Sequence, residues 1–318
     1  MKNMKNMKTM KIIDAHMHFS KISSFGDCAY RSSDVDYSAA GYGAEAKACG
    51  IVRSVCMGLF ENPPSVFPDK TAATPMLADL SDQLPPGIAL CPGINPHTLN
   101  AGAMRALEDM LDNAGNIACK NDDNIACKYG DNIAGNIAGK NGGNIAGVKI
   151  YAGYYHFDVN DPVYAPVYDF AERHDLPVVI HSGDTYSDKG LLVYAQPLSI
   201  DALAVGRPGM RIVLCHMGAP WVFDACEVVG KNDNVYMDLS GLLVGNAEYF
   251  ARMAGQRLLL DRYRQALIML DNYDKVLFGT DWPLAPMASY IDFCRELVPP
   301  EEYEKVFYGN AAKVFNLS

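Results

Sequence analysis

The sequence lacks the features that mark secreted and membrane proteins. Its nine cysteines form no CxxC pair, and their odd, scattered number indicates reduced and mostly buried thiols. No run of about 18 or more apolar residues occurs, as a membrane-spanning helix would require. The lysine-rich start also has no apolar segment long enough for a signal peptide. We therefore expect a cytoplasmic protein.

The sequence also has fewer basic residues than acidic ones. The chain has 27 lysines and arginines against 37 acidic residues, which gives a net charge of -10. Binding to nucleic acid or to an anionic membrane generally needs a basic face, so neither is expected as a partner. Neither a P-loop nor a GxGxxG turn is present, so nucleotide cofactors are not indicated.

What the sequence does contain is an alternation of short apolar segments and helical segments. Such alternation is typical of βα units around a parallel sheet, and eight strands that alternate with helices form a (β/α)8 TIM barrel. No linker rich in Pro, Gly or Ser divides the chain, so we expect a single domain. An open doubly wound sheet is the alternative, but it usually has fewer strands. The predicted strands span residues 11–19, 51–58, 87–95, 146–151, 176–183, 210–218, 234–241 and 275–281.

A short repeat interrupts this pattern before the fourth strand. The tripeptide NIA recurs at residues 116, 124, 132, 136 and 144. Removing the extra copies leaves an ordinary short connection between a helix and the fourth strand. We therefore interpret residues 114–145 as an expanded, repetitive loop within a barrel of residues 11–318, which follows a frayed tail at residues 1–10.

The repeat is expected to be dispensable for activity. Loops that lead into a barrel strand lie on the face opposite the active site. Deleting residues 116–143 should therefore leave turnover unchanged, measured on a purified variant that circular dichroism shows to be folded. A large fall in turnover without loss of folding would contradict this interpretation.

Five polar residues stand at the carboxyl ends of predicted strands. His16 and His18 form an HxH motif on the first strand, where alternation places both side chains on the same side, toward the barrel mouth. His181, His216 and Asp281 end the fifth, sixth and eighth strands after apolar runs. Buried imidazoles and carboxylates are costly unless they are paired or bound to metal, so this convergence indicates a divalent metal site.

The same residues in the same order resemble the amidohydrolase superfamily. The HxH motif and the segments VVIHSG, VLCHMG and LFGTDWP carry the resemblance. The phrases HMGAPW, NVYMDLSG, FGTDWP and YGNAAKVF are similar to its amidohydrolase-related group, which includes hydrolases and aromatic-acid decarboxylases. The resemblance covers the chain except for the first ten residues and the repeat. It is specific for the fold and the metal site and unspecific for the substrate.

The resemblance implies a role for each of the five residues. His16, His18, His181 and Asp281 match the metal ligands, and His216 matches a histidine beside the metal. A divalent ion lowers the pKa of bound water and polarises a carbonyl group, so Asp281 is expected as the base and His216 as the partner of the developing oxyanion. We expect Zn²⁺, with Mn²⁺, Fe²⁺ or Co²⁺ as alternatives.

Lys149 decides between one ion and two. Alternation turns Val148 and Ile150 outward and Lys149 into the barrel beside Tyr151. In relatives with two metals, a lysine on the fourth strand is carboxylated and bridges the ions, whereas the group with phrases such as HMGAPW more often has one. We favour one ion, with Lys149 hydrogen-bonded to the substrate or to a ligand, and keep metal ligation by Lys149 as the alternative.

Aromatic and polar residues in the loops after the strands are candidates for the pocket wall. An aromatic wall with a few polar groups suits a small organic substrate. The loops after strands 4, 5, 6 and 8 contain Tyr154, Tyr155, His156, Asp184, Tyr186, Trp221 and Trp282. The residues that we favour as substrate contacts are Lys149, Tyr151, Tyr155, Tyr186, Trp221 and Trp282.

Two reactions fit the expected metal site. The first is hydrolysis of a C–O or C–N bond in a lactone, ester or amide, and the second is non-oxidative decarboxylation of an aromatic or unsaturated carboxylic acid. A metal-binding protein without catalytic activity is a third interpretation, which the complete ligand set disfavours. We expect a hydrolase of a small molecule, and since barrels of this kind often pair, a homodimer is a further expectation.

Overall fold

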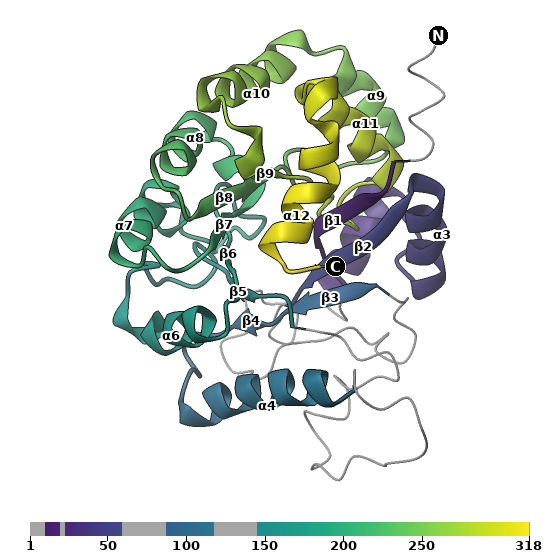
Figure 1. Ribbon diagram of the computed structural model, residues 1–318. Helices are drawn as coiled ribbons and strands as arrows, with labels where there is room; N and C mark the ends of the chain where they lie inside the picture. Colours follow the sequence, from purple (N-terminus) through teal and green to yellow (C-terminus); the bar gives the residue numbers. More distant parts are fainter. Residues whose placement is uncertain (1–9, 20–22, 59–86, 118–144, 318) are drawn as a thin grey trace.

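The strands of this protein run parallel to one another and the helices surround them (Figure 1). The computed structural model describes residues 10–19, 23–58, 87–117 and 145–317. Strands and helices alternate along these ranges, and the predicted (β/α)8 TIM barrel is confirmed. The strands are β1 (Ile12–Met17), β2 (Ile51–Met57), β3 (Ile88–Cys91), β4 (Gly93–Ile94), β5 (Val148–Ile150), β6 (Val178–Ile180), β7 (Ile212–Leu214), β8 (Val235–Asp238) and β9 (Val276–Leu277).

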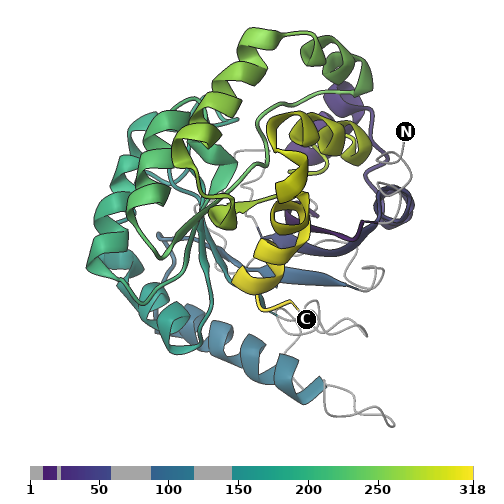
Figure 2. The ribbon, with the colours of Figure 1, turned by 45° about the horizontal axis from the view of Figure 1, so that its top comes forward.

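The helices lie outside the strands, except for the last one. In Figure 2 the strands converge at the centre and the C-terminal helix lies across them. The helices are α2 (Ser23–Cys28), α3 (Ala39–Cys49), α4 (Ala101–Ile117), α6 (Ala165–Arg173), α7 (Leu198–Gly206), α8 (Val222–Lys231), α9 (Ala247–Ala254), α10 (Arg257–Leu270), α11 (Met287–Leu297) and α12 (Asn310–Val314).

Two junctions join the strands into a ring. The predicted strand 87–95 is broken at Pro92, which has no N–H for a strand ladder, so β3 pairs with β2 and β4 pairs with β5. The carbonyl of Pro92 still accepts from the N–H of Lys149 at 2.8 Å. At the other junction, the N–H of Ala15 in β1 donates to the carbonyl of Phe278, just after β9, at 2.9 Å.

The apolar residues form two layers. Ile12, Val148 and Ile150 belong to the layer between the strands and the helices. A second, smaller cluster fills the barrel interior, where Val213 packs with residues of α12 such as Val314. Alternate strand residues thus belong to the two layers. The carboxyl ends of the strands, which carry the polar residues, form the mouth of the barrel.

Local sequence determines where several elements begin and end. α3 starts after Ser38, whose side chain accepts from the N–H of Gly41, and stops at Gly50, which has a left-handed φ of 76°. This left-handed residue turns the chain directly into β2. The side chain of Asn246 caps α9 in the same way as Ser38 caps α3, by accepting from the N–H of Tyr249.

Two predicted features lie outside the described residues. They are the first nine residues of the tail and residues 118–144, which carry most of the repeat between α4 and β5. Their interpretation as a tail and an expanded loop stays a prediction. The start of the predicted loop at residue 114 was wrong, because α4 continues to Ile117. Among the described helices, none has both the length and the apolar character to cross a membrane.

Candidate metal centre

A register shift at the end of β1 turns both histidines of the HxH motif to the same side. Between Asp14 and Met17, β1 contains one residue more than the paired segment of β2. Ala15 packs inside the barrel, so strict alternation would turn His16 outward. Because of the extra residue, His16 and His18 both line one cavity. The predicted common orientation is confirmed, but it depends on this irregularity.

Asp281 enters the site from the segment after β9. Its backbone is left-handed, with φ 58°, and its N–H donates to the carbonyl of His16 at 2.7 Å. Oδ1 of Asp281 lies 3.0 Å from Nε2 of His18 and 3.6 Å from Nε2 of His16. A Cβ atom on Gly241 would lie 2.6 Å from Oδ2, so a glycine at this position leaves room for the carboxylate.

His216 reaches the site through a left-handed turn after β7. Cys215 packs inside the barrel, so alternation would send His216 outward. Instead, His216 and Met217 adopt φ values of 59° and 48°, which L residues rarely do. The ring of His216 consequently lies with its centroid 4.9 Å from the ring of His16 and 4.9 Å from that of His181.

His181 and His216 together are one proton short when both rings are neutral. Nε2 of His181 lies 2.9 Å from the carbonyl of Asp184, and its Nδ1 lies 3.1 Å from Nε2 of His216. Nδ1 of His216 lies 3.1 Å from the carbonyl of Ser240. Three such contacts need three N–H protons, and two neutral imidazoles carry two. Burial lowers the pKa of both rings, which disfavours a third proton. A metal ion would instead satisfy the ring nitrogen that lacks a proton.

Asp238 orients His16 from the side away from Asp281. Its Oδ2 lies 2.9 Å from Nδ1 of His16, and its Oδ1 accepts from the N–H of His216 and from the N–H and hydroxyl of Ser240. Burial alone would raise the pKa of Asp238, but the neighbouring His16 lowers it below its ordinary value. The ionised carboxylate holds the proton of His16 on Nδ1, which leaves the lone pair of Nε2 free for a metal.

Two buried atoms at the centre of the site make no hydrogen bond of acceptable geometry within the described residues. They are Nε2 of His16 and Oδ1 of Asp281. Leaving a buried polar atom unsatisfied costs about 1–3 kcal/mol, so such atoms need an explanation. Nitrogen atoms of His16 and His18 and an oxygen of Asp281 all lie within 4.8 Å of one another. This donor set fits a divalent ion and explains both unsatisfied atoms.

The electrostatic environment favours the protonation states that bind metal. Burial alone would raise the pKa of Asp281, but the imidazoles of His18, His216 and His16 close to the carboxylate lower it below its ordinary value. Burial, together with the charge of Lys149, lowers the pKa of His16 to about 3. Asp281 is therefore ionised and His16 neutral at neutral pH, as ligation requires.

His181 and Lys149 lie next to this cluster. His181 lines the same cavity but faces Asp184 and His216 with its two nitrogens, so its predicted ligation stays a prediction. Lys149 is fully buried and points into the barrel, as predicted. Its Nζ donates to Sγ of Cys215 at 2.8 Å and lies 5.2 Å from the ring centroid of Tyr151.

The cluster lines a cavity of about 900 Å³. The predicted contacts Tyr151 and Tyr186 line it, and so does Tyr154. The ring of Phe25 stacks on that of His18 at 4.4 Å, which places an aromatic surface beside the candidate metal centre. Aromatic side chains therefore form part of the wall, together with aliphatic, polar and charged residues, as is usual for the site of a small organic substrate.

Three predicted substrate contacts are not among the described residues that line the cavity: Tyr155, Trp221 and Trp282. Trp282 is fully buried and stacks on Phe19, because the residue after Asp281 turns back into the outer apolar layer. Tyr155 is buried and packs with Tyr151 and Tyr154, and Trp221 precedes α8. The position of Trp282 does not fit the predicted substrate contact, whereas for Tyr155 and Trp221 that contact stays a prediction.

Sequence reasoning missed two residues of the site, Asp238 and Cys215. Asp238 ends β8 after an apolar run, which is the same signal that identified His181 and His216. Cys215 follows β7 and points into the barrel, but at this strand end only the adjacent His216 was assigned to the site. Strand-end position would have revealed both, whereas their partners depend on the fold.

The sequence matches the amidohydrolase family from residue 13 to residue 317. The chain belongs to this family. No curated protein matches it. This match confirms the predicted family resemblance.

Solved structures share the fold of this amidohydrolase. An uncharacterised TIM-barrel protein from Bordetella bronchiseptica has a TM-score of 0.65 at 20% identity, covering 96% of this chain and 99% of its own. A dihydroxybenzoic acid decarboxylase from a Polaromonas species, with bound manganese and the inhibitor 2-nitroresorcinol, has a TM-score of 0.59 at 15% identity, covering 97% and 98%. A probable 2-pyrone-4,6-dicarboxylic acid hydrolase from Acinetobacter baumannii, with citric acid bound, has a TM-score of 0.58 at 14% identity, covering 97% and 100%. At these identities the likeness establishes the fold alone.

Proposed function

We propose that this amidohydrolase hydrolyses a C–O or C–N bond of a small organic molecule, such as a lactone, ester or amide. The observation that carries the proposal is the pair of unsatisfied buried atoms, Nε2 of His16 and Oδ1 of Asp281, which lie 3.6 Å apart at the cavity. With His18 they would hold one divalent ion, and His181, which lines the same cavity, is the further ligand expected from the sequence. When bound, the ion supplies Lewis acidity, which acidifies water and polarises a carbonyl group.

Asp281 is the general base in this proposal. Its carboxylate is ionised, buried and directed into the cavity, so it can accept a proton from the attacking water. The same carboxyl group can then return the proton to the leaving oxygen or nitrogen. The Gly241 backbone and the imidazole of His216 border its Oδ2, which limits its movement between the two transfers.

His216 is placed to stabilise negative charge that develops on the substrate. Ser240 holds its Nδ1, and its Nε2, which faces His181, is the nitrogen that would donate to the oxyanion when it carries the proton. A preorganised polar group in a buried site stabilises a developing oxyanion more strongly than water does. Because Lys149 is hydrogen-bonded to Cys215, we propose a single ion and not a pair bridged by a carboxylated lysine.

Decarboxylation of an aromatic acid is the second candidate. The stacking of Phe25 on His18 and the presence of Tyr154 beside His181, at 4.7 Å between ring centroids, favour a planar ring close to the metal centre. Arg262 also lines the cavity and could balance the charge of a carboxylate. The Polaromonas decarboxylase shows that the fold accommodates such a reaction.

Metal analysis combined with a substrate panel tests the proposal. We expect about one Zn²⁺, or a similar divalent ion, per purified chain, and turnover of at least one lactone, ester or amide. Chelation should abolish that turnover, and adding the ion back should restore it, because the Lewis acid is lost and regained.

The panel also includes hydroxybenzoate-like acids. Release of carbon dioxide from one of them, with no hydrolysis of lactones, esters or amides, would replace the hydrolase by the decarboxylase. Protein that holds no divalent ion, and whose His16→Ala variant is unchanged in stability and activity, would contradict both reactions.

A further inference from the structure

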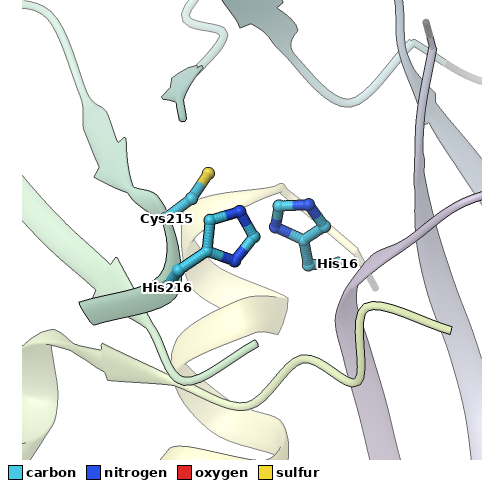
Figure 3. Close-up of side chains that lie close together, drawn as sticks. All are labelled: His16, Cys215 and His216. Carbon is cyan, nitrogen blue, oxygen red and sulfur yellow. The ribbon is translucent and has the colours of Figure 1, made fainter. Parts of the chain in front are cut away.

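We propose that Sγ of Cys215 is an additional ligand of the divalent ion and that it biases the site toward Zn²⁺ over Mn²⁺. The inference rests on the proposed metal-dependent function. Figure 3 shows the side chains concerned, His16 from β1 and Cys215 and His216 from the turn after β7, close together.

The three side chains form a compact set of metal donors. One ligand atom each of His16, Cys215 and His216 lies within 4.8 Å of the other two, and all three residues are buried. Two imidazoles and one thiolate are a donor set that binds zinc in proteins. The cysteine is therefore within reach of an ion held by the imidazoles.

His16 connects this set to the first one. It belongs both to the group with His18 and Asp281 and to the group with Cys215 and His216. Its Nε2 is fully buried and unsatisfied within the described residues, and Asp238 holds its other nitrogen. An ion bound at this nitrogen would have His18 and Asp281 as donors from the first group and Cys215 and His216 from the second.

Lys149 faces the sulfur of Cys215, although burial raises the pKa of this thiol above its ordinary value. A buried ammonium is costly unless an anionic or strongly accepting group faces it. Nζ of the fully buried Lys149 donates to Sγ of Cys215 at 2.8 Å, and a thiolate is a far stronger acceptor than a thiol. The thiol loses its proton when it binds a metal, and the ammonium then compensates the new charge.

The thiolate has a consequence for metal selectivity. Soft thiolate ligands favour Zn²⁺, whereas oxygen ligands suit Mn²⁺. A centre built from imidazoles and a carboxylate accepts either ion, and adding Cys215 shifts the preference to Zn²⁺. This amidohydrolase should thus differ in metal preference from relatives that have no cysteine at this position.

Cobalt substitution provides the test. The full-length protein, stripped with a chelator and reconstituted with Co²⁺, should show a near-ultraviolet band from charge transfer between sulfur and cobalt. The Cys215→Ser variant should lose this band but keep the visible bands of bound Co²⁺. Cys91→Ala is the matched control, because Cys91 is a fully buried cysteine of the same interior cluster on β3. It should keep both signals.

Competition between ions gives a second readout. The ratio of Zn²⁺ to Mn²⁺ affinity should fall by about 100-fold in Cys215→Ser. Removing a group that only hydrogen-bonds to a metal ligand already lowers metal affinity by up to about 100-fold, and here a direct ligand is removed. The control Cys91→Ala should keep the ratio of the unchanged protein.

Several outcomes would overturn the inference. One is a charge-transfer band that survives in Cys215→Ser. Another is a zinc X-ray absorption spectrum of the unmodified protein without a sulfur atom at about 2.3 Å, which decides the question even if the variant fails to fold. Hydrolysis without sulfur ligation would overturn this inference alone, and sulfur ligation without turnover of the substrate panel would overturn the proposed hydrolase alone. Protein that takes up neither Co²⁺ nor Zn²⁺ would overturn both.

Discussion

Replacing Asp281 with asparagine should lower turnover by about 10⁴-fold, the upper end of the contribution of a general base. The amide cannot accept the proton of water as the carboxylate does, and it is a weaker partner for a divalent ion. Asparagine has the same shape and tolerates the left-handed backbone of this position, so the fold should be kept. Steady-state kinetics of the metal-loaded protein measures the effect.

Asp271 offers a matched control for this variant. It also has a left-handed backbone, with φ 48°, but it is exposed at the end of α10. The Asp271→Asn variant should keep the turnover of the unchanged protein. Our assignment of Asp281 as the base would be wrong if Asp281→Asn, fully loaded with metal, retained more than about a tenth of the turnover.

Replacing Asp238 with asparagine should weaken metal binding by about 10–100-fold, the range for partners of metal-ligating histidines. One oxygen of Asp238 faces Nδ1 of His16, and the other faces three donors from His216 and Ser240. An amide NH₂ must replace one of these two acceptors. If it faces His16, the ring proton moves to Nε2 and blocks the metal. If it faces the three donors, it leaves buried groups unsatisfied at a cost of about 1–3 kcal/mol.

Titration with Zn²⁺ against a chromophoric chelator measures the affinity, and thermal unfolding of the metal-free protein measures the stability. Asp201→Asn is the control, because Asp201 pairs with Lys231 at the surface, where an ion pair contributes about 0–1 kcal/mol. It should change neither quantity appreciably. If Asp238→Asn bound Zn²⁺ as tightly as the unchanged protein, Asp238 would not control the orientation of His16.

The barrel was predictable because its signals are local. Apolar segments of strand length alternate with helical segments along the chain, and this order alone distinguishes a parallel barrel from a sandwich. Polar residues such as His181 and Asp281 stand out because they follow apolar runs at strand ends. The interruption of the third strand at Pro92 could also have been predicted from the sequence, since proline cannot donate to a strand ladder.

The direction of each side chain was harder to predict. Alternation counted along β1 from Ala15, and along β7 from Cys215, would turn His16 and His216 away from the mouth. A register shift in one case and a left-handed turn in the other reverse that result. Trp282 was misplaced for the same reason, because the left-handed backbone of Asp281 sends it into the outer layer.

The sequence by itself therefore determined the barrel, the strand ends that carry the polar residues and the family to which the chain belongs. Only the tertiary structure decided which of these residues meet: the approach of Asp281 to His16, the buried carboxylate of Asp238 behind that histidine, and the contact of Lys149 with Cys215. The physical reason is that strand formation follows from neighbouring residues, whereas these contacts join residues far apart in the chain. They depend on backbone irregularities that only the closed ring of strands holds in place.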